Sequence, residues 1–304
     1  MSETVLETSG LTKRFRGRTA VDDLTLTVMA GDVYGFLGPN GAGKSTTIRM
    51  LTGLVRPTSG TARLLGRDIR SRRVAASREV GALVESPAFY RYLSARENLT
   101  IFSELSGGCE KYRIDEVLEI VGLSDRADDK VRVFSHGMLQ RLGIAQSLLP
   151  NPRLVILDEP TTGLDPQGMR DVRDLIQRLS REKKVTIVLS SHLLHEVEQV
   201  CSRVGIINRG RLVAEGAVDE LIRREEEQVR FEVDDPRGAE HAALGIEGVT
   251  VLGVGDDEIV VRAKRESVPE INRALVAASI RVSAVVPKQD SLEDLFLKLT
   301  GEAT

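Results

Sequence analysis

The chain has 304 residues, enough for about two domains of ~150 residues each, and its 41% hydrophobic and 29% charged residues are typical of a globular protein. Its 42 basic and 45 acidic residues give a formal net charge of −3, which argues against a globally basic surface for binding nucleic acid. Two cysteines are too few for a disulfide framework. The sequence shows neither a run of ~18–20 apolar residues nor a hydrophobic secretion signal. We therefore expect a soluble protein of a reducing compartment.

Periodicity along the first two thirds of the chain predicts a mixed α/β domain. Leu24, Leu26 and Val28 alternate with more polar residues, which predicts a half-buried strand. An apolar run at 33–37 ends in a glycine-rich turn, and a helix is predicted from 44 to about 54. The stretch from about 94 to 149 is predicted to be helical. Short apolar runs, at 154–157 and 185–189, are typical of a parallel sheet covered by helices.

A charge run at 223–227 marks a predicted domain boundary, with one domain over 1–222 and a small α+β domain over 223–304. Beyond it, strands are predicted near 229–233, 249–254, 258–263 and 280–286, and helices near 239–244 and 269–278. This βαββαβ order is that of the ferredoxin-like split motif. A capping box of Ser291 and Asp294 predicts a final helix.

A phosphate-binding loop follows the predicted strand at 33–37. The pattern G-x-x-x-x-G-K-[ST] is matched by Gly38, Pro39, Asn40, Gly41, Ala42, Gly43, Lys44 and Ser45. Its glycines allow backbone N–H groups to surround phosphate oxygens, and the following helix adds its positive end. We expect Lys44 to bridge the β- and γ-phosphates, Ser45 to bind Mg²⁺, and Thr46 to join the site. The alternative is a glycine-rich turn with an exposed lysine, but the strand before and the helix after favour a nucleoside triphosphate.

Two carboxylates end the apolar run at 154–157. Asp158 is placed to hold Mg²⁺ through water, and the adjacent Glu159 to polarise an attacking water. The alternative is a pair of solvated acids that open a turn before Pro160. Downstream of a phosphate-binding loop, the catalytic interpretation is favoured.

Further motifs make the sequence resemble the ATP-binding subunit of an ABC transporter over about residues 4–220. Residues 134–138 resemble the signature motif of that family, usually LSGGQ, and residues 163–165 resemble its D-loop, which ends in Asp165. His192 follows a strand where the family has its switch histidine, and Phe15 stands where the family places an aromatic ring on adenine.

The resemblance implies a P-loop NTPase domain with antiparallel β and helical subdomains, the helical one over about 94–150. It also implies a head-to-tail dimer that binds ATP and Mg²⁺, with Asp165 at the nucleotide interface. Each ATP would lie on the Lys44 loop of one subunit and beneath Ser135 and Gly137 of the other. His192 would bond the γ-phosphate and orient water beside Glu159.

Two departures from the family pattern matter. Glu85 stands where the family's Q-loop has glutamine, and we expect it near Mg²⁺. A glutamate at this position resembles the sequences of exporters for bacitracin-type and lantibiotic self-protection. Its alternative interpretation is a solvated loop acid. In the signature motif, His136 replaces a glycine and Met138 replaces the glutamine, whereas the two expected phosphate contacts remain.

The favoured function is the energy-coupling subunit of an ABC exporter for an antibiotic, drug or other amphiphilic compound. We expect it to lie peripherally on the cytoplasmic face of the cell membrane, docked on a polytopic permease through residues 86–98, with a second ATPase subunit and no nucleic acid. The alternatives are a soluble ABC ATPase acting on ribosomes or nucleic acid, which would usually carry two cassettes, and an importer ATPase. A metal site at His192 and His195 is disfavoured because no third ligand is visible.

Overall fold

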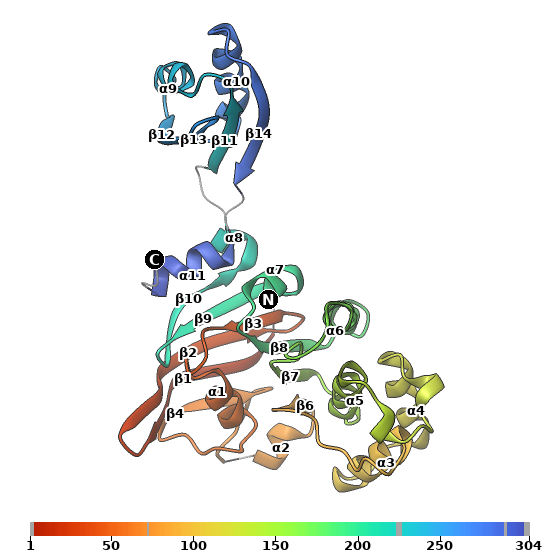
Figure 1. Ribbon diagram of the computed structural model, residues 1–304. Coiled ribbons are helices and arrows are strands. Elements are labelled where there is room, and N and C mark those ends of the chain that lie inside the picture. The colour runs from red at the N-terminus through yellow and green to blue at the C-terminus, as the bar shows by residue number, and fades with distance from the viewer. Residues whose placement is uncertain (1–2, 72, 223–226, 289–290, 301–304) are drawn as a thin grey trace. The chain divides into compact units, whose positions relative to one another are not determined.

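The computed structural model describes residues 3–71, 73–222, 227–288 and 291–300 and divides the chain into two compact units, Met1–Val218 and Asp219–Thr304 (Figure 1). Residues 223–226 of the predicted charge run lie outside the described residues. Among the helices of the described ranges, none is long and apolar enough to cross a membrane.

Two sheets form the framework of the first unit. An antiparallel sheet has the order β2-β1-β4-β5 and consists of β1 (Thr4–Phe15), β2 (Arg18–Met29), β4 (Ser59–Leu64) and β5 (Arg67–Asp68). A larger sheet has the order β10-β9-β3-β8-β7-β6 and consists of β3 (Val33–Leu37), β6 (Val80–Leu83), β7 (Leu154–Asp158), β8 (Thr186–Ser191), β9 (Arg203–Asn208) and β10 (Arg211–Ala217). All its neighbouring pairs are parallel except β10 with β9.

The predicted strands of the first unit are confirmed. Every residue of β3, β7 and β8 is buried, as expected for a parallel sheet covered on both faces. In β2, Leu24, Leu26 and Val28 are buried and alternate with more exposed residues, as the period-2 pattern predicts. Because β3 and β7 are neighbours of β8, their carboxyl ends lie at the same edge of the sheet.

The helices of the first unit start in different ways, and only some of those described have a side-chain cap. They are α1 (Lys44–Leu51), α2 (Arg73–Ser77), α3 (Ala95–Leu105), α4 (Lys111–Ile120), α5 (His136–Leu148), α6 (Pro166–Arg181) and α7 (Leu194–Val200), with 3-10 turns at Ser124–Arg126 and Val131–Val133. Ser94 caps α3 in a capping box, and Asp165 caps α6. The helix predicted to reach about residue 54 ends at Leu51, since Gly53 has a φ of 73°, outside the helical region. The predicted helical stretch is confirmed as α3, α4 and α5 (Figure 1).

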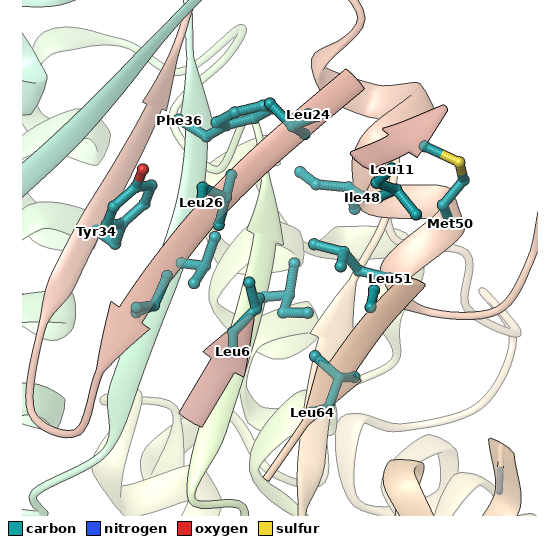
Figure 2. Close-up of a cluster of buried hydrophobic side chains, with 14 of the residues drawn as sticks. Leu6, Leu11, Leu24, Leu26, Tyr34, Phe36, Ile48, Met50, Leu51 and Leu64 are labelled. Carbon is teal, nitrogen blue, oxygen red and sulfur yellow. The ribbon is translucent and has the colours of Figure 1, made fainter. Parts of the chain in front are cut away.

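The core between the two sheets fixes α1 in place. Figure 2 shows Leu6, Leu24 and Leu26 of the antiparallel sheet packed toward α1, which contributes Ile48 and Met50. Both α1 residues are fully buried, and α1 contacts β2 of one sheet and β7 of the other. Burying such side chains stabilises the fold by about 1.5–3 kcal/mol each before the entropic cost, so the position of the phosphate-binding loop at the start of α1 is rigidly determined.

A partly buried polar network lies beside the same core. Tyr34 on β3 is fully buried, and its hydroxyl donates to Glu215 Oε1 on β10 at 2.9 Å. Arg203 on β9 pairs with Asp32 at 3.3 Å and with Glu215 at 3.7 Å, and it lies over the Tyr34 ring. Burial raises the pKa of Tyr34, and the nearby Glu215 raises it further, so the phenol stays protonated and keeps donating. The network ties β10 to the centre of the sheet.

The second unit contains a sheet of order β12-β13-β11-β14 in which every pairing is antiparallel. Its elements are α8 (Val218–Ile222), β11 (Glu227–Val233), α9 (Pro236–Leu244), β12 (Thr250–Val254), β13 (Glu258–Ala263), a 3-10 turn (Arg265–Ser267), α10 (Val268–Ala277), β14 (Val282–Lys288) and α11 (Leu292–Thr300). Phe231 is fully buried in a core that α9 and α10 cover. The predicted βαββαβ order is the observed one, and Asp294 N donates to Ser291 Oγ at 3.1 Å in the predicted capping box.

Candidate active site

The loop of residues 38–43 joins β3 to α1 and needs glycine at three positions. Gly41 and Gly43 have φ values of 81° and 112°, in the region that favours glycine. A Cβ on Gly43 would lie 2.5 Å from Ala20 O, and one on Gly38 would lie 2.3 Å from Ile207 O. Larger residues would therefore push the loop away from the strands that support it.

Lys44 begins α1 with its side chain almost entirely buried. Its Nζ donates to Gly38 O at 2.7 Å and forms an ion pair with Glu159 Oε1 at 3.2 Å. The side chain is 5% exposed, so the ammonium group is held inside the loop by a carbonyl and a carboxylate from another strand end. A phosphate oxygen that enters the loop would meet a cation already positioned for it.

Ser45 and Asp158 meet where α1 begins and β7 ends. Ser45 Oγ donates to Asp158 Oδ1 at 3.3 Å, and Ser190 Oγ on β8 donates to the same oxygen at 2.6 Å. Asp158 is buried. Hydroxyl and carboxylate oxygens are the hard ligands that Mg²⁺ prefers, and the ion usually takes its remaining ligands from phosphate and water. This pair of side chains therefore fits a Mg²⁺ ion bound together with a nucleotide.

Glu159 is the most connected side chain of the site. Its Oε2 lies 2.7 Å from His192 Nδ1 and accepts from Thr162 Oγ1 at 3.0 Å, while Oε1 faces Lys44. Its backbone has a φ of 50°, and its N–H donates to Ser190 Oγ at 2.9 Å. Burial favours the neutral acid, but the hydrogen bond from His192 and the charge of Lys44 outweigh it and hold the pKa of Glu159 below its ordinary value. The carboxylate of Glu159 is therefore ionised in the free chain.

A cavity of about 600 Å³ connects these groups to the β1–β2 hairpin. Phe15 at the end of β1 is half-exposed and lines it, and Lys13 Nζ covers the Phe15 ring at 5.0 Å from its centroid. The same Nζ donates to Arg56 O at 2.7 Å, which holds the lysine over the ring. The full lining is Phe15, Arg18, Ala20, Pro39, Asn40, Gly41, Gly43, Lys44, Ser45, Thr46, Glu159, Thr162 and His192.

Three residues of that lining were missed by the sequence analysis: Arg18, Ala20 and Thr162. Thr162 carried a signal, because it stands three residues after Glu159, the spacing of a turn. Arg18 and Ala20 carried none, because the hairpin position that brings them to the loop depends on the pairing of β1 with β2. Ser190, which joins Asp158 and Glu159, was not singled out from the sequence either.

Several predicted residues do not line this cavity. Ser135 caps α5 by accepting from Met138 N at 3.2 Å, and Asp165 caps α6 by accepting from Gly168 N at 3.0 Å. Gly137, in the first turn of α5, is also absent from the lining, as are Gly38, Ala42 and Asp158. Within one chain, as far as the structure describes it, Ser135 and Gly137 therefore do not line the cavity that contains Lys44.

Glu85 also lies apart from the cavity lining. It has a φ of 65° and forms an ion pair with Arg49 in the last turn of α1. His192 lies between β8 and α7, whereas His195 is 77% exposed and bonds Gln199 Nε2 at 2.8 Å. Over the described ranges, no group of three His, Cys, Asp or Glu side chains is arranged to hold a metal ion.

Comparisons with known proteins agree with this arrangement. The family model for ABC transporters matches residues 21–162. The bacitracin transport ATP-binding protein BcrA of Bacillus licheniformis is 43% identical over 99% of this chain and 99% of its own. The daunorubicin/doxorubicin resistance ATP-binding protein DrrA of Streptomyces peucetius is 38% identical over 97% of this chain and 92% of its own. A solved structure of an ATP-binding subunit of an ABC transporter is 30% identical with a TM-score of 0.63, covering 71% of this chain and 91% of that one.

Proposed function

Because the chain belongs to the ATP-binding subunits of ABC transporters, we propose that it powers the export of an antibiotic, drug or other amphiphilic compound through a separate membrane permease. Proteins of this family bind and hydrolyse ATP, dimerise and work with membrane permeases. The observation that carries the proposal is the extent of the likeness. BcrA matches 99% of the chain at 43% identity, so the likeness includes the second unit as well as the ATPase unit.

Two further observations support an antibiotic or drug as cargo. DrrA, named for resistance to daunorubicin and doxorubicin, also matches 97% of the chain. Glu85 replaces the usual glutamine, as in the bacitracin- and lantibiotic-type exporters that the sequence resembles. Its pairing with Arg49 balances the added charge at the surface of α1.

Nucleotide binding would use the two ends of the cavity. Phe15 offers one face of its ring to adenine, since Lys13 covers the other. Lys44 would exchange its contact with Glu159 for oxygens of the β- and γ-phosphates. Ser45 and Asp158 would hold Mg²⁺, which when bound neutralises charge on the transferring phosphate.

Hydrolysis would then depend on Glu159. Once phosphate oxygens occupy Lys44, the Glu159 carboxylate is released from its ion pair and can accept a proton from water. That water attacks the γ-phosphorus, the bond from phosphorus to the bridging oxygen breaks, and ADP leaves with the bonding electrons. His192, 2.7 Å from Glu159 Oε2, would orient the carboxylate and contact the γ-phosphate.

A second copy of the chain would complete each site. Ser135 and Gly137 lie at the N-terminus of α5, where a hydroxyl and backbone N–H groups favour anions. Because neither residue lines the cavity of its own chain, we infer that they contact the nucleotide of a partner in a head-to-tail homodimer, with Asp165 at the same interface.

The permease would dock on the loop between β6 and α3. Tyr90 and Tyr92 in this loop are 46% and 68% exposed, and their rings pack edge to face. Fully buried Asn98 accepts from Tyr90 N at 2.8 Å and donates to Tyr90 O at 3.1 Å, which fixes the loop on α3. Exposed aromatic rings on a rigid loop suit a protein partner. Docking there would place the chain peripherally on the cytoplasmic face of the membrane.

The proposal is tested by purifying tagged chain from detergent-solubilised membranes of its host and identifying what accompanies it. We expect a stoichiometric polytopic protein. Cells that carry the pair should resist bacitracin or anthracyclines better than cells with the Glu159→Gln chain, whereas Glu182→Gln, at an exposed acid beyond α6, should resemble wild type. Recovery only with ribosomes or nucleic acid would refute the transporter role. Drug-independent uptake of a solute would indicate an importer.

A further inference from the structure

Arg18 stands beside the ring that we assign to adenine. Phe15 and Arg18 are directly paired across the β1–β2 hairpin, and the side chains of such a pair project from the same face of the sheet. Both residues line the cavity of about 600 Å³. The hairpin therefore presents an aromatic ring and a guanidinium group to the cavity side by side.

The guanidinium group also touches the phosphate-binding loop. Arg18 Nη2 donates to Gly41 O at 3.2 Å, and a Cβ built on Gly41 would lie 3.5 Å from the same nitrogen. Guanidinium has five N–H donors, so this single hydrogen bond leaves most of them available. Of the ion pairs formed by the described residues, none includes Arg18, whereas Lys44 is paired with Glu159. Arg18 therefore brings to the cavity lining a positive charge that has no carboxylate partner among the described residues.

Lys13, a second cation of the hairpin, already has partners. Lys13 donates to Arg56 O at 2.7 Å and covers the far side of the Phe15 ring. It does not line the cavity. Arg14 and Arg16 do not line the cavity either, so Arg18 is the cation of this hairpin that lines it.

We infer that Arg18 binds the α-phosphate of the nucleotide. Phe15 marks the base end of the cavity and Lys44 the β- and γ-phosphate end, assignments on which this inference rests. Arg18 contacts the loop at Gly41 and is paired with Phe15, so its position lies between the two ends. The α-phosphate is the charged group nearest the base, and a guanidinium fork matches two of its oxygens.

The test compares Arg18→Gln with Arg16→Gln in the full-length chain. Arg16 is an exposed arginine in the turn of the same hairpin and does not line the cavity, so the two variants lose the same charge. ADP, AMP and adenosine are titrated by competition against a fluorescent ADP. Arg18→Gln should weaken ADP and AMP by the same factor, about five- to tenfold, and leave adenosine unchanged. Arg16→Gln should leave all three unchanged.

Other patterns overturn the inference. Equal losses for adenosine would assign Arg18 to the base or ribose, a loss for ADP without AMP would assign it to the β-phosphate, and equal effects of both variants would indicate general surface charge. The nucleotide site itself is checked separately with wild type and Lys44→Ala. If wild type binds ADP and Lys44→Ala does not, an unchanged Arg18→Gln refutes only the role of Arg18. If wild type fails to bind ADP, the proposed function fails first.

Discussion

Replacing Glu159 with glutamine should separate ATP binding from ATP hydrolysis. Glutamine keeps the size of the side chain and a carbonyl acceptor for His192, but it loses the charge that faces Lys44 at 3.2 Å. At an effective dielectric constant of about 20, the Coulomb attraction of that pair is about 5 kcal/mol before desolvation is subtracted. Removing it leaves the buried ammonium group of Lys44 without its counterion, held by the carbonyls of Gly38 at 2.7 Å and Pro39 at 3.4 Å.

The loss should therefore appear in the nucleotide-free protein and shrink when ATP is bound. We expect the variant to be less stable to unfolding by about 1–3 kcal/mol without ATP, because Lys44 lacks its counterion. When ATP is bound, phosphate oxygens replace that counterion. Linkage therefore requires ATP to bind to the variant at least as tightly as to wild type, and up to ~10-fold more tightly. Turnover should fall by ~10² or more, because water loses its proton acceptor.

The assay combines urea unfolding with and without ATP, a binding titration, and phosphate release at saturating ATP. Glu182→Gln is the matched control, since that acid is exposed beyond the end of α6. Hydrolysis at the wild-type rate would refute Glu159 as general base. Loss of ATP binding would instead show that the carboxylate organises the phosphate-binding loop.

Three further predictions concern other parts of the chain. Glu85→Gln should preserve ATP affinity and change the free energy of unfolding by less than about 1 kcal/mol, because the side chains of Glu85 and its partner Arg49 are 62% and 41% exposed. Complete loss of ATP affinity in a titration would instead make Glu85 a primary metal ligand. Phe231→Ala should destabilise the second unit by about 3–5 kcal/mol, read by hydrogen exchange of β11 amides, and a cost below 1 kcal/mol would contradict its core role. Burial opposes ionisation of Glu159, but the His192 hydrogen bond and the Lys44 charge keep its pKa lowered. The ionised carboxylate therefore stabilises the fold above the ordinary pKa of 4.5, and this stabilisation is lost as the pH falls through the lowered pKa. The difference in unfolding free energy between wild type and Glu159→Gln should close in acid, and a constant difference would contradict this.

Local sequence signals predicted most of the elements because their causes are local. The alternation at Leu24, Leu26 and Val28 follows from a strand with one buried face, and the apolar runs became β3, β7 and β8. Helix ends were predicted less well. The end of α1 depends on the backbone angles of Gly53, which a count of apolar positions does not contain.

Chemistry confined to one short segment was therefore determined by the sequence alone. The loop around Lys44 binds phosphate through adjacent backbone groups, and Asp158 and Glu159 stand at the end of one strand, so both were recognisable without a fold. What the tertiary structure decided is which distant groups meet. The 3.2 Å contact of Lys44 with Glu159 requires β3 and β7 to flank β8, and the contact of Arg18 with Gly41 requires the hairpin to reach the loop. Sheet order is set by packing among all the strands at once, and no periodicity within a single strand records it.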